Sequence, residues 1–290
     1  MHAYIHCGLD VGSGTAKAVA LDPDGQVCFS TYRPTQGRPL QIAHAILQDL
    51  EGRFSPGQIA GLTCTGTGGK RIASLLGAGF VNEIICHAKA VGTSYPQART
   101  IIDIGGEDAK LIVVRPDANH RLAIRDFALN TVCAAGTGAF LEQQAARLGY
   151  DIETFSRLAE QAANVPTIAG RCTVFAKSDM IHLQQNGVLD DEIIAGLCFA
   201  IVRNLKTNIA KGKEIVPPLV FQGGVSANLG VQRAILELLV NSPQELIIPQ
   251  HSKVMGAMGA ALQGQEEGQA GAYPGLDPLQ EALHHAPPLT

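Results

Sequence analysis

Asp10-Val-Gly-Ser-Gly-Thr-Ala-Lys17 and Asp103-Ile-Gly-Gly-Glu-Asp-Ala-Lys110 are two copies of one pattern, D-x-G-x-x-x-A-K. A short apolar stretch precedes each copy and another follows it, so each copy predicts a strand, a glycine turn and a second strand. A repeat of this kind is typical of a duplicated supersecondary unit. The aspartates would lie where the first strands end, and the glycines would let backbone N–H groups approach a ligand closely.

Two such hairpins predict a phosphate clamp for a nucleotide, with backbone donors, two carboxylates for a hydrated Mg²⁺ and two lysines. The alternative is two unrelated turns rich in Asp and Gly, and the lysine at the same offset in both copies favours the clamp. Strand alternation could also point either lysine to solvent. The expected clamp residues are Asp10, Gly12, Ser13, Gly14, Thr15 and Lys17 in the first copy, and Asp103, Gly105, Gly106, Glu107 and Lys110 in the second.

A third nucleotide signal follows the apolar strand expected over 219–222. It reads Gly223-Gly-Val-Ser-Ala-Asn228 and stands before a helix expected over 231–240. Taken alone, an ordinary turn with Ser226 as the helix N-cap accounts for it. Together with the two hairpins it predicts an adenosine site, because two glycines let a flat base or ribose lie close to the backbone. The residues expected to contact the nucleoside are Gly223, Gly224, Val225 and Asn228.

Composition limits the possible classes of protein. The chain has 290 residues, 46% hydrophobic and 17% charged, which suits two ordinary domains or one large one. A net charge of −4 argues against a general nucleic-acid binder. No apolar run approaches the roughly 20 residues that span a bilayer, and no signal-peptide pattern stands at the start. We therefore expect a cytoplasmic protein that binds neither nucleic acid nor membrane.

Periodicity predicts the order βββαβα twice over, hence an α/β protein with two lobes. We expect an N-terminal lobe over 1–98, a C-terminal lobe over 99–264 and a flexible tail over 265–290, which is rich in Gly, Gln, Pro and Ala. The expected strands are 4–9, 18–21, 26–32, 59–64, 100–102, 111–114, 121–127, 219–222 and 245–248. The expected helices are 39–50, 69–76, a segment with Glu83 and His87, 139–148, 152–160, 173–185, 191–211, 231–240 and 254–262.

Two of the seven cysteines, Cys133 and Cys172, each stand just before a predicted helix. A helix N-terminus lowers the pKa of a thiol and attracts anions, and a [4Fe–4S] cluster on four thiolates is an anion. One chain would supply two ligands, so a two-fold homodimer would complete the set. The residues alone leave equal room for ordinary free thiols. Zinc is disfavoured, because no C-x-x-C pair or matching His spacing is present.

The two hairpins and the glycine turn at 223–228 resemble the nucleotide motifs of the actin, Hsp70 and sugar-kinase ATPase superfold. That resemblance implies two ribonuclease-H-like lobes with an ATP cleft between them. Residues 132–141 and 170–180 resemble the cluster segments of the activator ATPases of 2-hydroxyacyl-CoA dehydratases, which belong with the ATPase subunits of benzoyl-CoA reductase. Residues 82–87 are also similar, and the resemblance extends from Gly8 to about Leu262.

The resemblance implies an oxygen-sensitive homodimer in which Cys133 and Cys172 of both chains bind one [4Fe–4S] cluster. ATP would be hydrolysed to ADP with Mg²⁺, held through water by Asp10 and Asp103. A ferredoxin or flavodoxin would supply electrons for a partner 2-hydroxyacyl-CoA dehydratase or related iron–sulfur reductase. Glu107 departs from the Gln common in that family, and its carboxylate could act as a general base or face Mg²⁺. The cysteines with no implied role are Cys7, Cys28, Cys64, Cys86 and Cys198.

Two other functions stay open from the sequence. A small-molecule kinase of the same superfold, such as an N-acetylhexosamine kinase, would need a catalytic Asp, for which Asp126 is a weak candidate. A non-enzymatic ATP-binding sensor would bind ATP without iron, so iron content separates both from the activator.

Glu83 and His87, at i,i+4, could be metal ligands, but with no third ligand visible a helix hydrogen bond or interface packing is favoured.

Overall fold

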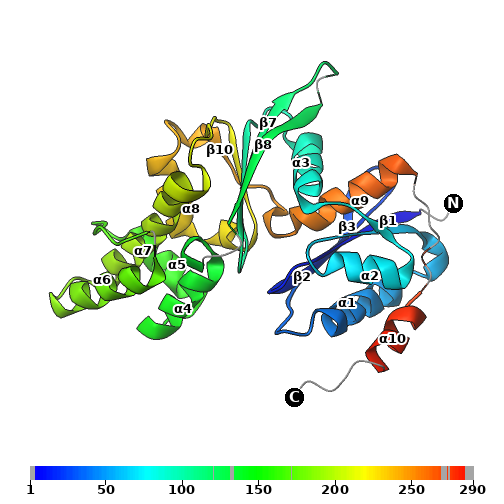
Figure 1. Ribbon diagram of the computed structural model, residues 1–290, viewed down its shortest axis with the longest axis horizontal. Coiled ribbons are helices and arrows are strands. Elements are labelled where there is room, and N and C mark those ends of the chain that lie inside the picture. The colour runs from blue at the N-terminus through cyan, green and yellow to red at the C-terminus, as the bar shows by residue number, and fades with distance from the viewer. Residues whose placement is uncertain are drawn as a thin grey trace. The chain divides into compact units, whose positions relative to one another are not determined.

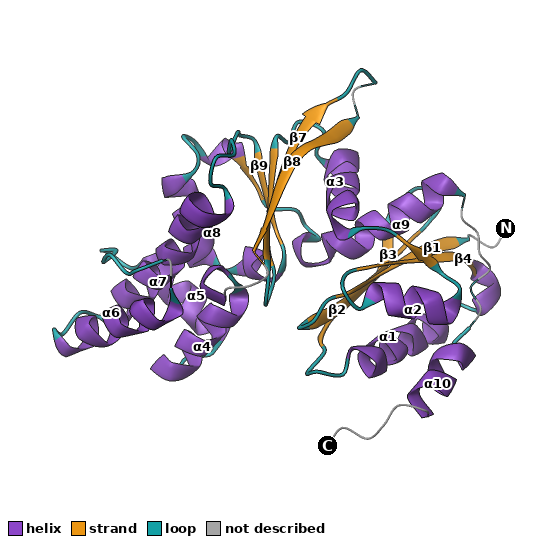
Figure 2. Ribbon diagram, viewed as in Figure 1, coloured by secondary structure: helices purple, strands orange, loops and turns teal. Residues whose placement is uncertain are grey.

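The computed structural model describes residues 4–119, 121–130, 134–170, 172–268, 273 and 275–284. The chain forms two compact units, Met1–Ser94 with Val254–Thr290 and Tyr95–Lys253, each built on one five-stranded mixed sheet (Figures 1 and 2). None of the helices in these described ranges combines the length and the apolar character that crossing a bilayer requires.

The first unit has the strand order β3-β2-β1-β4-β5, with β1 antiparallel to β2 and parallel to β4. Its strands are β1 (Ile5–Val11), β2 (Thr15–Leu21), β3 (Val27–Pro34), β4 (Ile59–Thr65) and β5 (Gly79–Phe80). Its helices are α1 (Pro39–Arg53), α2 (Gly69–Leu76), α3 (Glu83–Ser94), α9 (Met255–Glu267) and α10 (Asp277–His284).

The second unit has the strand order β10-β9-β6-β7-β8. Its strands are β6 (Thr100–Ile104), β7 (Ala109–Pro116), β8 (Leu122–Asn130), β9 (Leu219–Gln222) and β10 (Leu246–Ile247). Its helices are α4 (Gly138–Leu148), α5 (Ile152–Gln161), α6 (Thr173–Gln185), α7 (Asp190–Asn204) and α8 (Leu229–Leu238).

The two sheets are copies of one topology, because β8-β7-β6-β9-β10 repeats β3-β2-β1-β4-β5. The repeat holds at the level of single residues. Asp10 pairs with Lys17 across β1 and β2, and Asp103 pairs with Lys110 across β6 and β7. The predicted duplication and the predicted α/β class are therefore confirmed.

Strand alternation separates a core face from a polar face in both sheets. In the second unit, Ile102, Ile104 and Leu111 join the core beneath α4, α5, α7 and α8. Asp103 and Lys110 occupy the intervening positions and so belong to the opposite face. The first unit repeats this division, with Leu9 and its alternate neighbours in the core under α1 and α2. Each Asp–Lys pair is thus placed by the periodicity of its strand.

Helix α9 belongs to the first unit, and this corrects the expected lobe boundary at 264. Its small residues let it lie directly on β1 and α3: a Cβ on Gly8 would stand 1.8 Å from the Ala257 carbonyl oxygen, and one on Gly259 1.8 Å from that of Cys86. The expected flexible tail is also wrong for the residues described there. Helix α10 packs on α1 and α2, with Leu279 fully buried in the first unit's core.

Local differences from the predicted elements are few. The helix expected over 191–211 ends at Asn204 and continues as a π-helix, Leu205–Ile209. The strand expected over 245–248 keeps only two residues, and the two-residue β5 was not predicted. Both short strands pair in parallel at a sheet edge. A strand of two residues is too short to show the alternation of apolar and polar residues that predicts a strand.

Gly259→Ala should destabilise the first unit by at least about 2 kcal/mol, because the new methyl group would overlap a backbone carbonyl of α3 that cannot move alone. Gly52→Ala is the matched control: Gly52 is also helical, but a Cβ there meets nothing within 4 Å. That change should leave stability unchanged or raise it by about 0.5–1 kcal/mol. Urea unfolding of both variants measures this, and equal midpoints would contradict the close-packing argument.

Candidate functional site

The first predicted phosphate hairpin is a tight turn closed by a bond from the Gly12 N–H to the Thr15 carbonyl (2.9 Å). Lys17 points back along the hairpin, with Nζ 3.1 Å from Asp10 Oδ2. Asp10 is only 7% exposed. The ammonium therefore balances a nearly buried carboxylate, and the prediction that Lys17 could point to solvent does not hold.

The second hairpin repeats this arrangement and buries it further. Gly105 N–H donates to the Asp108 carbonyl (2.9 Å). Lys110, 3% exposed, lies 3.3 Å from Asp103 Oδ2 and 2.6 Å from Asp108 Oδ2. One buried ammonium thus meets two carboxylates. Glu107 is exposed at the tip of the turn, where a bound phosphate or metal ion could reach it.

Neighbouring segments of the first unit enclose Asp10. Gly66, with φ +84°, leaves no room for a side chain, because a Cβ would stand 2.6 Å from Asp10 Oδ1. A Cβ on Gly256, at the start of α9, would stand 2.8 Å from Asp10 Oδ2 and 3.2 Å from His87 Cε1. The sequence predicted neither approach. His87 is 5% exposed, and its ring and the Asp10 carboxylate both lie beside Gly256.

The loop at 65–70 and Thr35 also support the first hairpin. Gly68 N–H donates to the Val11 carbonyl (2.8 Å), so the loop that leads into α2 lies against the turn. Thr35 is fully buried; its N–H donates to the Gly14 carbonyl (2.9 Å), and its hydroxyl donates to the Ser13 carbonyl. Both contacts hold the turn in shape. No local sequence signal marks Thr35, because its partners lie more than twenty residues away.

The predicted adenosine motif forms a short 3-10 helix, Gly224–Ala227, after β9. Gly223 has φ +91°, and a Cβ there would lie 2.4 Å from the Ile104 carbonyl oxygen, so only glycine fits. The N-cap of α8 is Asn228, whose Oδ1 accepts from Val231 N–H (3.0 Å); Ser226 instead donates to the Gly223 carbonyl. The interpretation of Ser226 as the cap was wrong. Asn228 Nδ2 is buried without a hydrogen-bond partner in the structure.

Three predicted motifs meet at Gly138, at the N-terminus of α4. Gly138 N–H donates to the Gly105 carbonyl (2.9 Å), and Ala139 N–H donates to the Gly106 carbonyl (2.7 Å). A Cβ on Gly138 would stand 3.0 Å from Val225 Cγ2. The phosphate hairpin, the adenosine motif and the chain that follows Cys133 are therefore in direct contact within one unit.

Cys172 is the half-buried N-cap residue of α6, and its thiol forms no disulfide. Cys133 lies outside the described residues. Burial raises the pKa of Cys7, Cys64 and Cys86 to about 12 and also raises those of Cys28 and Cys198. Protonated thiols are poor metal ligands, which supports the prediction that these five are not ligands. Within the described ranges, no three His, Cys, Asp or Glu side chains gather as a metal site.

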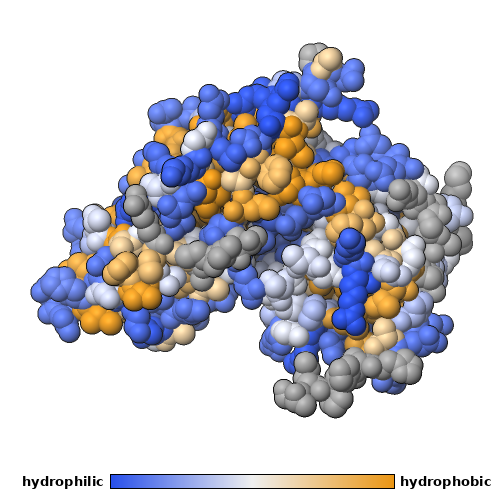
Figure 3. Space-filling view, in the orientation of Figure 1, coloured by the Kyte–Doolittle hydropathy of each residue, from blue (hydrophilic) through white to orange (hydrophobic). Residues whose placement is uncertain are grey.

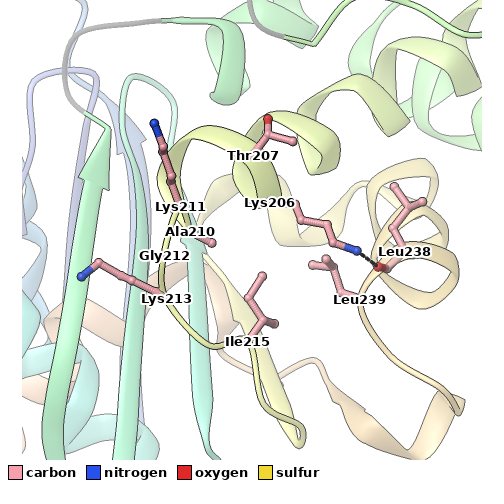
Figure 4. Close-up of a pocket in the computed structure, with 9 residues that line it drawn as sticks. All are labelled: Lys206, Thr207, Ala210, Lys211, Gly212, Lys213, Ile215, Leu238 and Leu239. Carbon is pink, nitrogen blue, oxygen red and sulfur yellow. Dashed lines mark hydrogen bonds between the residues drawn. The ribbon is translucent and has the colours of Figure 1, made fainter.

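A separate cavity of about 630 Å³ in the second unit contains none of the predicted site residues. It lies between the π-helix and the end of α8, and Figure 4 shows Lys206 pointing across it to the Leu238 carbonyl (3.1 Å). Lys211 and Lys213 point away from it. Lys213 instead pairs with Asp126 (2.6 Å), and that hydrogen bond lowers the pKa of Asp126. A lowered pKa makes the Asp126 carboxylate a weaker base.

The chain is similar over nearly its full length to known ATPases. Residues 7–264 match the BadF/BadG/BcrA/BcrD ATPase family. A 2-hydroxyisocaproyl-CoA dehydratase activator from Clostridioides difficile is 33% identical over 263 residues, covering 90% of this chain and 94% of that protein. An activator of lactoyl-CoA dehydratase from Anaerotignum propionicum is 32% identical over 275 residues, covering 90% and 98%.

A solved structure agrees with these relatives. The activator of the 2-hydroxyisocaproyl-CoA dehydratase from Clostridium difficile with bound ADPNP has a TM-score of 0.78 and 29% identity, covering 99% of both chains. With the duplicated sheet topology, this likeness confirms the predicted fold of the actin, Hsp70 and sugar-kinase superfold. The matched residues include both hairpins, the glycine turn and the segments around Cys133 and Cys172, and on that basis the chain belongs to the BadF/BadG/BcrA/BcrD ATPase family.

Proposed function

We propose that this protein is an ATP-dependent activator that passes a low-potential electron to a partner iron–sulfur enzyme. The observation that carries the proposal is the meeting of three motifs at Gly138. There the phosphate hairpin touches both the adenosine motif and the chain leading from Cys133. This contact would let a nucleotide at the hairpin act on the segment that follows Cys133.

Each hairpin is suited to contact the phosphates of a bound ATP. Asp10 and Asp103 offer carboxylates for a hydrated Mg²⁺, which prefers oxygen ligands and keeps several waters. Lys17 and Lys110 are held beside those carboxylates, within reach of an incoming phosphate. The turn glycines and Ser13 and Thr15 would contact phosphate oxygens, and Gly223, Gly224, Val225 and Asn228 the nucleoside. The bound ADPNP in the related activator supports a nucleotide here.

Cys172 fits the role of a cluster ligand. It stands at the N-terminus of the 13-residue α6, where the helix dipole favours the net negative charge of a bound cluster. We propose that Cys133 and Cys172, with the same residues of a second copy, hold one [4Fe–4S] cluster. When bound, such a cluster supplies a single electron at low potential.

The surface beside Cys172 suits a second copy of the chain. Val174 and Phe175, in the first turn of α6, are 64% and 65% exposed. On β8, Phe127 and Leu129 are also exposed, and Figure 3 shows apolar side chains among the polar ones on this unit's surface. Large apolar side chains next to a metal ligand are costly to leave in water and would be covered in a dimer.

Nucleotide can act on the cysteine segments through the backbone of the second unit. The carbonyls of Gly105 and Gly106 accept hydrogen bonds from the N–H groups of Gly138 and Ala139. A phosphate bound at these two glycines would therefore change the position of the peptide groups that contact α4. A shift of that turn therefore moves the N-terminus of α4. ATP and ADP can change the cysteine positions only if they bind the two arrangements with different affinity.

The partners follow from the relatives. We propose that the acceptor is a 2-hydroxyacyl-CoA dehydratase or a related iron–sulfur reductase, since the similar proteins are named as activators of such dehydratases. A ferredoxin or flavodoxin is the proposed donor. The protein would work in the cytoplasm and be sensitive to oxygen. Asp126, the candidate base of the kinase alternative, is paired with Lys213.

Asp103→Asn should lower ATP hydrolysis by at least about 100-fold, because a carboxylate for Mg²⁺ is lost. Lys110 keeps its contact with Asp108, so the buried ammonium stays paired and the variant should fold. Iron content should not change. Asp49→Asn, an exposed residue paired with Arg33, is the control and should hydrolyse normally. Phosphate release measures the rate, and hydrolysis within twofold of wild type in Asp103→Asn would remove the second hairpin from the mechanism.

Glu107→Gln tests whether the exposed carboxylate at the turn acts as a general base. Loss of a base should lower kcat by about 100-fold to 10,000-fold while ADP binding stays unchanged. A carboxylate that only faces Mg²⁺ would instead raise the Mg²⁺ concentration needed for half-maximal rate. Glu142→Gln, exposed on α4, is the control. An unchanged kcat at every Mg²⁺ concentration would exclude both roles.

Cys172→Ser should abolish iron binding and leave ADP binding intact. Wild-type protein prepared without oxygen should be a dimer with about two irons per chain, as one shared four-iron cluster requires. Cys28→Ser is the matched control, since Cys28 is also a half-buried free thiol and should keep wild-type iron. Iron and sulfide assays and the mass in solution measure this. An iron-free or monomeric wild-type protein would contradict the proposed function.

A further inference from the structure

Asn204 is a buried amide at the end of a helix that is otherwise apolar on its inner side. It closes α7, is 3% exposed, and is surrounded along the helix by residues such as Ile201 and Leu205 that are almost fully buried. Burying an amide among such residues is unfavourable unless its polar atoms have specific partners. The identity of those partners is therefore informative.

One partner is the segment that leads to Cys172. Asn204 Nδ2 donates to the Gly170 carbonyl (2.5 Å), two residues before the cysteine. The preceding residue reinforces this contact, because Arg203 Nη2 donates to the Ile168 carbonyl (3.3 Å). Gly170 itself lies so close to α7 that a Cβ would stand 2.5 Å from the Ala200 carbonyl oxygen. The last turn of α7 thus holds the backbone just before Cys172.

The other neighbour is the segment that follows Cys133. A Cβ on Gly136 would stand 3.0 Å from Asn204 Oδ1, so that segment passes directly over the amide. Two residues later, Gly138 N–H bonds to the Gly105 carbonyl of the phosphate hairpin. One side chain therefore lies between the two cysteine-bearing segments, close to the point where the hairpin contacts one of them.

We propose that Asn204 is a positioning residue that sets the spacing of the Cys133 and Cys172 segments within one chain. The inference rests on the proposed function, since it concerns the two thiols assigned there as cluster ligands. An amide suits the position: it donates to a carbonyl on one side and presents an oxygen on the other, without adding charge near an anionic cluster. The π-helix that follows directly widens the backbone at this point, as such segments often do near functional sites.

The test compares Asn204→Leu and Asn204→Asp with Ile201→Val, a control one turn earlier on the same buried side of α7. Asn204→Leu removes the hydrogen bond to Gly170 and the amide oxygen that lies against Gly136. Asn204→Asp keeps the size but replaces the donor to Gly170 with a negatively charged acceptor. Three quantities are measured on protein prepared without oxygen: amide hydrogen exchange of residues 134–138 and 168–173, the rate of iron release to a ferrous chelator with and without ADP, and the EPR spectrum of the reduced protein.

In both Asn204 variants, exchange should rise about tenfold in the two segments together, iron release should quicken at least tenfold, and the EPR line shape should change. ADP binding should stay within twofold of wild type, and Ile201→Val should resemble wild type throughout. If the wild-type protein contains iron but amide exchange in the Asn204 variants is unchanged, or changes in only one of the two segments, the positioning role is overturned. An iron-free wild type would overturn the proposed function, and with it the ligand-positioning role.

A second arm identifies the contact itself. Gly136→Ala places a methyl group against Asn204 Oδ1 and should by itself speed iron release. Combined with Asn204→Ser, which shortens the side chain, it should add less than the sum of the two single effects, because both changes act on one contact. Fully additive effects on the rate of iron release would show that Gly136 and Asn204 act independently, and this would contradict the proposed contact between them.

Discussion

Close backbone approach at Gly138 is the constraint on which the second unit depends. Its N–H reaches the Gly105 carbonyl and its missing side chain leaves space for Val225, so three loops of different elements meet within hydrogen-bond distance. A Cβ there would lie 3.0 Å from Val225 Cγ2 and 3.1 Å from the Gly105 carbonyl oxygen, so these neighbours would have to shift. Since interiors are close-packed, such contact points transmit displacement instead of absorbing it.

The buried Asp–Lys pairs follow the same electrostatic requirement in both units. A carboxylate taken out of water needs a compensating charge, and the lysine at the same register of the next strand supplies it. This explains why the aspartate and the lysine recur together: antiparallel register places them opposite each other on the polar face of the sheet. The first unit adds His87 and the start of α9 beside Asp10, whereas the second adds Asp108 beside Lys110. The duplicated hairpins have therefore acquired different surroundings.

Helix α7 connects packing with the proposed chemistry. Along most of its length it is an apolar core element of the second unit. At its end the pattern changes, with Arg203 and Asn204 bonded to backbone carbonyls before Cys172 and a π-helix next in the chain. A rigid helix whose last turn contacts both cysteine segments can hold them at a constant spacing while other parts of the unit adjust.

The sequence by itself determined most strands and helices, the duplicated hairpins and the positions of the glycine turns. These depend on local patterns: alternation in strands, glycines in turns, and a repeat that places Asp and Lys at equal offsets. Only the tertiary structure decided that α9 and α10 return to the first unit, that Thr35 supports the Ser13 turn, and that Asn204 lies between Gly136 and Gly170. Each of these is a contact between residues far apart in the chain. Their partners are chosen by shape and by the need to satisfy buried polar groups, which leave no period or spacing in the sequence.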